Sequence, residues 1–254
     1  MEFIDSLINY ERKPPSPRNR TAYTLGRIKH LLADLDNPHK SFRSVHIAGT
    51  KGKGSTATML SNMLQGSGYK VGLYTSPHIS DIRERISVNG ALISAAAFVR
   101  LTAKIAHAVA RYKPEEKPTY FEALTVMAFQ YFHPANIDIA VVEVGLGGRL
   151  DATNIVRPEV CGITSISLDH MAQLGNTIEA IAEEKAGIFK EGVPIISAPQ
   201  PKSVKQVLRK SAEKLKAPVM FAGDDIEFSY RFESSRTGGP QASIWAPRQN
   251  GHFE

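Results

Sequence analysis

The chain has 254 residues, 42% of them hydrophobic and 22% charged, which is the composition of a soluble globular protein with a sizeable core. The formal net charge is +6, but the basic residues are scattered and no RNA-reading pattern occurs, so nucleic-acid binding is a weak alternative. A single cysteine, Cys161, excludes an internal disulfide framework. Without a signal peptide or a long apolar run, we expect a cytoplasmic protein that binds no membrane.

The N-terminal part of the chain predicts helices on either side of a strand. Residues 3–10 form a short amphipathic pattern that ends at a proline cluster, and residues 23–35 have apolar side chains at helical spacing. Residues 45–48 are a short apolar strand, and a further helix is expected to end at residue 65. The apolar stripe of that last helix is expected to consist of Met59, Leu60, Met63 and Leu64.

The glycine-rich segment GTKGKGST lies between that strand and that helix. Strand, glycine-rich loop and helix are typical of a phosphate-binding loop, because glycines let backbone N–H groups approach an anion and the helix N-terminus adds positive charge. The expected nucleotide contacts are Gly49, Thr50, Lys51, Gly52, Lys53, Gly54, Ser55 and Thr56. The match to the Walker motif is imperfect, since the motif needs a glycine at Ile47 and a hydroxyl at Gly54. A turn without a ligand is the alternative, and Ser55 or Thr56 would be ordinary N-caps in both cases.

A second strand is predicted at residues 70–74, and the segment 75–89, TSPHISDIRERISVN, fits neither a strand nor a helix. The segment is charged, contains a proline and ends at the turn dipeptide Asn89–Gly90. We interpret it as a functional surface loop. Its Arg83 and Arg85, taken alone, favour a solvated face.

The rest of the chain continues the alternation of helices and strands. Helices are predicted at 94–111, 120–132, 177–187 and 203–215, and strands at 137–144, 160–168, 193–197 and 218–221. The strand IDIAVVEV fits a parallel strand buried on both faces, so Glu143 near its end needs a partner or a metal. The loop GLGGRLDATN that follows is not a dinucleotide fingerprint, because Leu150 stands where the third glycine should be. Cys161 lies in an apolar run and is expected in the core.

This alternation predicts an α/β fold, doubly wound, with a mostly parallel sheet flanked by helices. We assign residues 1–222 to this domain and 223–254 to an incomplete or irregular tail with a small edge hairpin at 228–232. Ligands of such folds bind outside the carboxyl ends of the strands. The glycine-rich loop, the segment 75–89, Glu143 and the pair Asp169–His170 all follow strand ends, so we expect them to converge.

A nucleotide phosphate at this edge would bring Mg²⁺, a hard cation that prefers oxygen ligands. Glu143 is the natural candidate for holding it. His170 is a weaker candidate, because a lone histidine at a strand end is more often a hydrogen-bonded structural residue.

Seven motifs, which occur in order along the chain, are similar to those of a known family. They are HIAGTKGKGS, YTSPHI, RERI, FEALT, EVGLGGRLDATN, SLDH and EKAGIFK. Together they resemble the folylpolyglutamate synthase/dihydrofolate synthase family of the Mur ligase superfamily, over residues 24–216. The resemblance implies a P-loop NTPase-like Mur ligase central domain.

The implied activity is that of an ATP-dependent carboxylate–amine ligase, which adds L-glutamate to dihydropteroate, to reduced folates or to both. The carboxylate is activated as an acyl phosphate, and because two anions then meet, cations must face the transferring group. The resemblance implies that Lys53 and the loop amides hold the ATP phosphates, that Ser76 and Glu143 hold one Mg²⁺, and that His170 helps to hold a second. Lys53, Lys185 and His170 are the expected catalytic residues.

Lys185 matches the lysine that is carbamylated by CO₂ in this family. A carbamate would supply an anionic oxygen near the second metal, whereas the alternative is an ordinary lysine on a charged helix face. On the pterin side, Asp151 and Ala152 match positions that line the dihydropteroate pocket, and Phe121 is expected to stack on the pterin. The segment 75–89 matches the omega loop that covers the folate site.

The expected partners are ATP, a folate-type substrate and L-glutamate, and the expected state is a monomer. Members of the family have a second α/β domain that supplies glutamate contacts, and we expect this domain to be absent from the chain. As given, the chain is therefore expected to bind nucleotide weakly and to ligate poorly. Dihydrofolate synthase, folylpolyglutamate synthase or both remain open, and the alternatives are another Mur-type ligase or a non-catalytic nucleotide-binding fragment.

Overall fold

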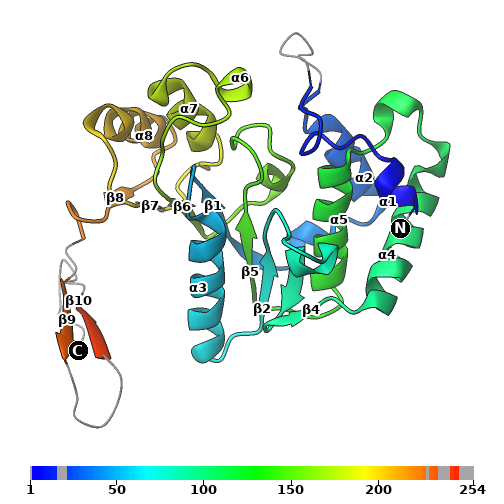
Figure 1. Ribbon diagram of the computed structural model, residues 1–254, viewed down its shortest axis with the longest axis horizontal. Coiled ribbons are helices and arrows are strands. Elements are labelled where there is room, and N and C mark those ends of the chain that lie inside the picture. The colour runs from blue at the N-terminus through cyan, green and yellow to red at the C-terminus, as the bar shows by residue number, and fades with distance from the viewer. Residues whose placement is uncertain (1, 16–21, 227–228, 234–240, 246–254) are drawn as a thin grey trace.

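A mostly parallel sheet of eight strands forms the centre of the computed structural model, which describes residues 2–15, 22–226, 229–233 and 241–245 (Figure 1). The strands are β1 Arg43–Ala48, β2 Val71–Tyr74, β3 Ile86–Val88, β4 Ala91–Leu92, β5 Ile139–Glu143, β6 Val160–Ile163, β7 Ile195–Ser197 and β8 Val219–Phe221. Their order is β4-β3-β2-β5-β1-β6-β7-β8, in which β2–β3 and β3–β4 pair antiparallel and the other neighbours pair parallel. The predicted α/β fold class is confirmed.

Helices cover both faces of this sheet. The α-helices are α1 Glu2–Ser6, α2 Gly26–Asp34, α3 Lys53–Gly66, α4 Ala95–Ala108, α5 Tyr120–Phe132, α6 Met171–Leu174, α7 Ile178–Ala186 and α8 Lys202–Lys214. Short 3₁₀ helices lie at Pro38–Lys40, Ile82–Arg85, Val109–Arg111, Pro114–Glu116 and Ala152–Ile155. Among the described residues, no helix is both long enough and apolar enough to cross a membrane.

The register of the strands shows which helices share a face. Val142 belongs to the cluster under α5, and Cys161 belongs to the cluster under α7 and α8. Both residues pair with His46 on β1, so these helices lie on one side of the sheet. α3 packs on the other side, against the side chains of Val45 and Ile47. The buried position of Cys161 agrees with its predicted place in the core.

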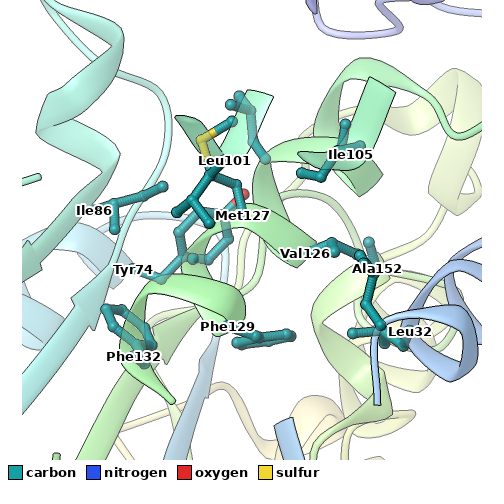
Figure 2. Packing of buried hydrophobic residues seen from close by; sticks show 14 of the residues in the cluster. Leu32, Tyr74, Ile86, Leu101, Ile105, Val126, Met127, Phe129, Phe132 and Ala152 are labelled. Atoms are coloured by element: carbon teal, nitrogen blue, oxygen red, sulfur yellow. The ribbon is translucent and has the colours of Figure 1, made fainter. Parts of the chain in front are cut away.

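The largest core cluster lies around α5, the most deeply buried helix (Figure 2). Thr119 caps this helix, and Glu122 completes a capping box by accepting a hydrogen bond from the Thr119 amide. Figure 2 shows Phe129, Phe132 and Met127 of α5 among side chains of the neighbouring elements. Burial of this helix fixes its first turn at the edge of the sheet where β2 and β5 end.

The predicted apolar stripe of α3 was wrong in part. Met59 and Met63 are 59% and 69% exposed, whereas Ala57 and Ser61 are the buried side chains of the helix. Leu60 and Leu64 are partly buried and pack against the sheet beside that small-residue row. The pattern pointed to the larger side chains, but the small ones face the strands.

Three predicted boundaries also change. The segment 75–89 is not free of regular structure, because its residues 86–88 form β3 and pair antiparallel with β2. The strand predicted at 160–168 ends at Ile163, and the first helix ends at Ser6. In the tail, β9 (Ser229–Glu233) and β10 (Gln241–Trp245) pair in a sheet of their own, so the hairpin is not at the edge of the main sheet. Of the remaining tail residues, 223–226 are described and lie just after β8, and the others lie outside the described part. The division at residue 222 stays a prediction.

Candidate nucleotide and substrate site

The glycine-rich loop leaves the end of β1 through Gly49, where only glycine fits. Its φ is +147°, and a Cβ built there would lie 1.8 Å from Thr164 Oγ1. The Thr50 amide donates to the Ser165 carbonyl at 2.9 Å, and the Thr50 hydroxyl bonds the Ser167 backbone. The loop is therefore seated on the segment that follows β6.

The start of α3 has no side-chain cap, which corrects the expectation that Ser55 or Thr56 would be the N-cap. Gly52 is the N-cap residue, in the left-handed conformation with φ of 82°, and Ser55 and Thr56 fall within the helix. The first amides of α3 are therefore not used by a capping side chain, and they carry the positive end of the helix dipole. Lys53 is the first residue of this helix and is half-buried.

Glu143 lies at the end of β5 beside the same loop. Its side chain is 3% exposed, and its Oε2 accepts a hydrogen bond from the Ser76 amide at 3.0 Å. A Cβ on Gly54 would lie 3.3 Å from that oxygen, so the carboxylate borders the first turn of α3. Burial raises the pKa of Glu143, while the Ser76 hydrogen bond and the charge of Lys53 oppose this shift. The structure thus brings Ser76, Glu143 and the glycine-rich loop together, as expected.

Lys185 reaches the loop from the opposite side. It is 4% exposed in the last turn of α7, and its Nζ donates to the Gly49 carbonyl at 2.7 Å. Desolvation, with a smaller effect of the Lys53 charge, lowers the pKa of Lys185 to about 8, against an opposing effect of Asp169. A lysine with this pKa loses its proton near neutral pH far more readily than an exposed one.

His170 differs from this group in its exposure. Its side chain is 58% exposed at the start of α6, and its Nε2 lies 3.8 Å from Asp169 Oδ1. Within the described residues, no three His, Cys, Asp or Glu side chains gather closely enough to hold a metal ion. The role expected for His170 stays a prediction.

The loop GLGGRLDATN holds the turn of α7 that carries Lys185. The Arg149 amide donates to the Glu184 carbonyl at 2.9 Å, and a Cβ on Gly148 would lie 2.6 Å from that carbonyl oxygen. Asn154 donates from Nδ2 to the carbonyls of Arg149 and Gly187, at 2.9 and 3.0 Å. Sequence reasoning missed this role of Asn154. The signal available in the sequence was the pair Gly147–Gly148 in the same loop, which indicates a close approach of backbone.

The three residues expected at the pterin differ in exposure. Phe121 is half-buried and borders Gly145, where a Cβ would lie 2.5 Å from its ring. Asp151 is buried, and its carboxylate accepts hydrogen bonds from the Leu146 amide and from the amide and hydroxyl of Thr153. Ala152 is buried in the core cluster of α5 (Figure 2).

Thr153 also connects this loop to β1. Its hydroxyl proton goes to Asp151, so the hydroxyl must accept from His46 Nε2, which lies 2.8 Å away. His46 is fully buried, and desolvation lowers its pKa to about 3, which keeps the ring neutral. His46 was not singled out from the sequence as a residue with its own role.

Comparison with known proteins identifies the family. Residues 47–238 match the sequence profile of the Mur ligase middle domain. The chain belongs to the Mur ligase family. This Mur ligase domain is 49% identical over 197 residues to a dihydrofolate synthase/folylpolyglutamate synthase of Bacillus subtilis, covering 76% of this chain and 46% of that protein. It is 40% identical over 246 residues to a mitochondrial folylpolyglutamate synthase of Homo sapiens, and this match covers 95% of this chain and 40% of that protein.

The solved structures agree with this assignment. A structure described as an FPGS–AMPPCP–folate complex has a TM-score of 0.85 and 32% identity, and covers 99% of this chain and 59% of its own. The predicted resemblance to folylpolyglutamate and dihydrofolate synthases is confirmed. The Mur ligase chain spans less than half the length of the two curated relatives.

Proposed function

We propose that this chain is the ATP-binding part of an ATP-dependent ligase that adds L-glutamate to dihydropteroate, to reduced folates or to both. The observation that carries the proposal is that an uncapped helix start, Lys53 and the buried Glu143, which is bonded to Ser76, all lie around one glycine-rich loop. Backbone amides and a lysine aimed at one point suit the phosphates of a nucleotide. The FPGS structure with AMPPCP and folate supports both ligand classes.

The residues at the end of β5 fit a magnesium ion. Glu143 offers a buried carboxylate, and Ser76 offers a hydroxyl on a residue already bonded to it. Mg²⁺ is usually held by one or two carboxylates with phosphates and water, so the absence of a larger acidic cluster among the described residues is compatible with it. When bound, the ion would neutralise charge on the phosphates. His170 is proposed as a contributor to a second ion.

The chain's own residues then have distinct tasks. The loop amides and Lys53 hold and orient the phosphates, which offsets the repulsion between a transferring phosphoryl group and the substrate carboxylate. Lys185 is proposed to react with CO₂ as the neutral amine, and the lowered pKa and burial of this lysine support that proposal. The pterin is proposed to lie beside Phe121, with Asp151 and Ala152 forming the wall behind it.

Replacing Lys53 with alanine tests nucleotide binding directly. We expect the affinity for Mg-AMPPCP to fall by at least about tenfold, because one charge facing the phosphates is lost. Lys51→Ala is the matched control, since Lys51 is exposed on the same loop. Isothermal titration calorimetry gives both constants. Equal affinity of wild type and Lys53→Ala, or binding of RNA that is stronger than binding of nucleotide, would contradict the proposal.

The two serines near the loop should differ in importance. The backbone amide of Ser76 bonds Glu143 and is kept in Ser76→Ala, so this change removes only the hydroxyl beside that carboxylate, whereas Ser55 is exposed on α3. We therefore expect Ser76→Ala to reduce Mg-ATP hydrolysis by about tenfold to a hundredfold and Ser55→Ala to reduce it much less. Steady-state hydrolysis over a range of Mg²⁺ concentrations measures both. The opposite order of effects would refute the assignment of Ser76 to the metal.

A further inference from the structure

The loop of residues 75–85 is held in shape by its own groups. The carboxylate of Glu84 accepts hydrogen bonds from the three successive amides of residues 79–81, at 2.7, 3.0 and 2.8 Å. The Thr75 amide donates to the Arg85 carbonyl at 3.0 Å, which closes the base of the loop. Asp81 pairs with Arg83 within the same segment. These bonds bring the two ends of the loop together and connect residues 79–81 to Glu84.

Arg85 fastens this unit to the rest of the molecule. Its side chain is 1% exposed, which contradicts the expectation of a solvated face for this residue. Both of its terminal nitrogens bond Glu11 in a two-pronged ion pair, at 2.8 and 2.7 Å. Its Nε donates to His78 Nδ1 at 2.9 Å, and its guanidinium carbon lies 5.6 Å from the ring centre of Tyr120. One side chain thus joins the N-terminal segment, the tip of the loop and the start of α5.

These contacts lie next to the proposed folate pocket. Tyr120 directly precedes Phe121, and the Tyr120 amide donates to the Ile8 carbonyl at 2.9 Å, so the N-terminal segment meets α5 at this point. Ser76, in contrast, is held independently by the hydrogen bond that its backbone amide donates to Glu143. Loss of the Arg85 side-chain contacts should release the tip around His78 while the Ser76 end stays in place.

We infer that Arg85 is a positioning residue, which with Glu11 holds the tip of the loop, residues 77–81, at the mouth of the folate pocket. The inference rests on the proposed function for the identity of the ligand. It assigns the Glu11–Arg85 pair to binding of the pterin-bearing substrate and not to binding of nucleotide.

The test uses this chain with Glu11→Gln, Arg85→Gln and the double variant. The control is Arg100→Gln, because Arg100 is exposed on α4 and lies outside the loop and the network of Arg85. Affinities for tetrahydrofolate, dihydropteroate and Mg-AMPPCP are measured by calorimetry. Hydrogen exchange of the residues 77–81 is followed without ligand, and chemical denaturation checks that each variant is folded.

Glu11→Gln should weaken binding of the pterin-bearing ligand by about tenfold and leave nucleotide affinity within about twofold, with faster exchange at the tip. The double variant should lose little more affinity than each single variant, because either substitution alone already removes the Glu11–Arg85 ion pair. Equal losses for both ligands, or unchanged pterin affinity in folded variants, would overturn the inference. If wild type binds nucleotide but neither pterin ligand, the proposed function fails. The exchange data then decide alone, and unchanged exchange at the tip overturns the anchoring role.

Discussion

Gly49→Ala should cost the chain on the order of 3 kcal/mol of unfolding free energy and reduce nucleotide affinity more than a hundredfold. The added Cβ would lie 1.8 Å from Thr164 Oγ1 and 3.1 Å from the Thr164 amide nitrogen. The backbone φ of +147° is also one that alanine rarely adopts. The loop must therefore move away from the segment after β6, and its backbone N–H groups then no longer point toward the proposed phosphate position. Urea denaturation and calorimetry with Mg-AMPPCP measure the two effects.

Gly66→Ala is the matched control for this change. Gly66 is the last residue of α3 and its φ is not positive. A Cβ added there would meet no atom of the described residues within 4 Å outside the backbone of its own helix. This substitution should change stability by less than about 1 kcal/mol and leave nucleotide affinity unaltered.

A double substitution separates the two sources of the Gly49→Ala effect. Adding Thr164→Ala to Gly49→Ala should recover part of the stability, because it removes the nearest contact but not the backbone strain. The same urea denaturation compares the single and double variants. Full stability of Gly49→Ala alone would show that the loop is not fixed by this close approach.

Lys185→Met should change how stability depends on pH. Burial lowers the pKa of Lys185 from 10.5 to about 8, so the folded chain binds fewer protons than the unfolded chain between these values. The cost of holding this lysine is therefore fully present below about pH 8 and disappears as the pH rises toward 10.5. Relative to Lys185→Met, wild type should gain on the order of 3 kcal/mol across this window. Urea denaturation of both proteins at several pH values measures the difference.

The proposed chemistry of Lys185 has its own readout. Bicarbonate labelled with ¹³C should give a carbamate resonance in wild type and none in Lys185→Met, since only the neutral amine reacts with CO₂. Lys51→Met controls for the loss of one lysine, because Lys51 is exposed on the glycine-rich loop. The same pH dependence in wild type and Lys185→Met would show that this lysine is not desolvated in the folded chain.

Much of the fold could be predicted because its signals are local. The run of β5, the glycine-rich loop after β1 and the capped helix α5 each depend on neighbours a few residues away. The alternation of strands and helices then restricted the topology, and the parallel order brought Glu143 to the same edge as the loop. The same reasoning failed for the apolar stripe of α3. Periodicity shows that a helix has an apolar side, but it does not show how closely the sheet approaches, and a close approach selects the small side chains.

The sequence by itself determined the fold class, the family and the position of the glycine-rich loop, because these depend on patterns and motifs within short segments. Only the tertiary structure decided which polar groups meet. Lys185 lies 136 residues from Gly49, and Arg85 lies 74 residues from Glu11. Whether a charged side chain is solvated or buried and paired depends on the partners that folding brings to it. For this reason two arginines of the same motif differ. Arg83 is partly exposed and pairs with Asp81, whereas Arg85 is buried and pairs with Glu11.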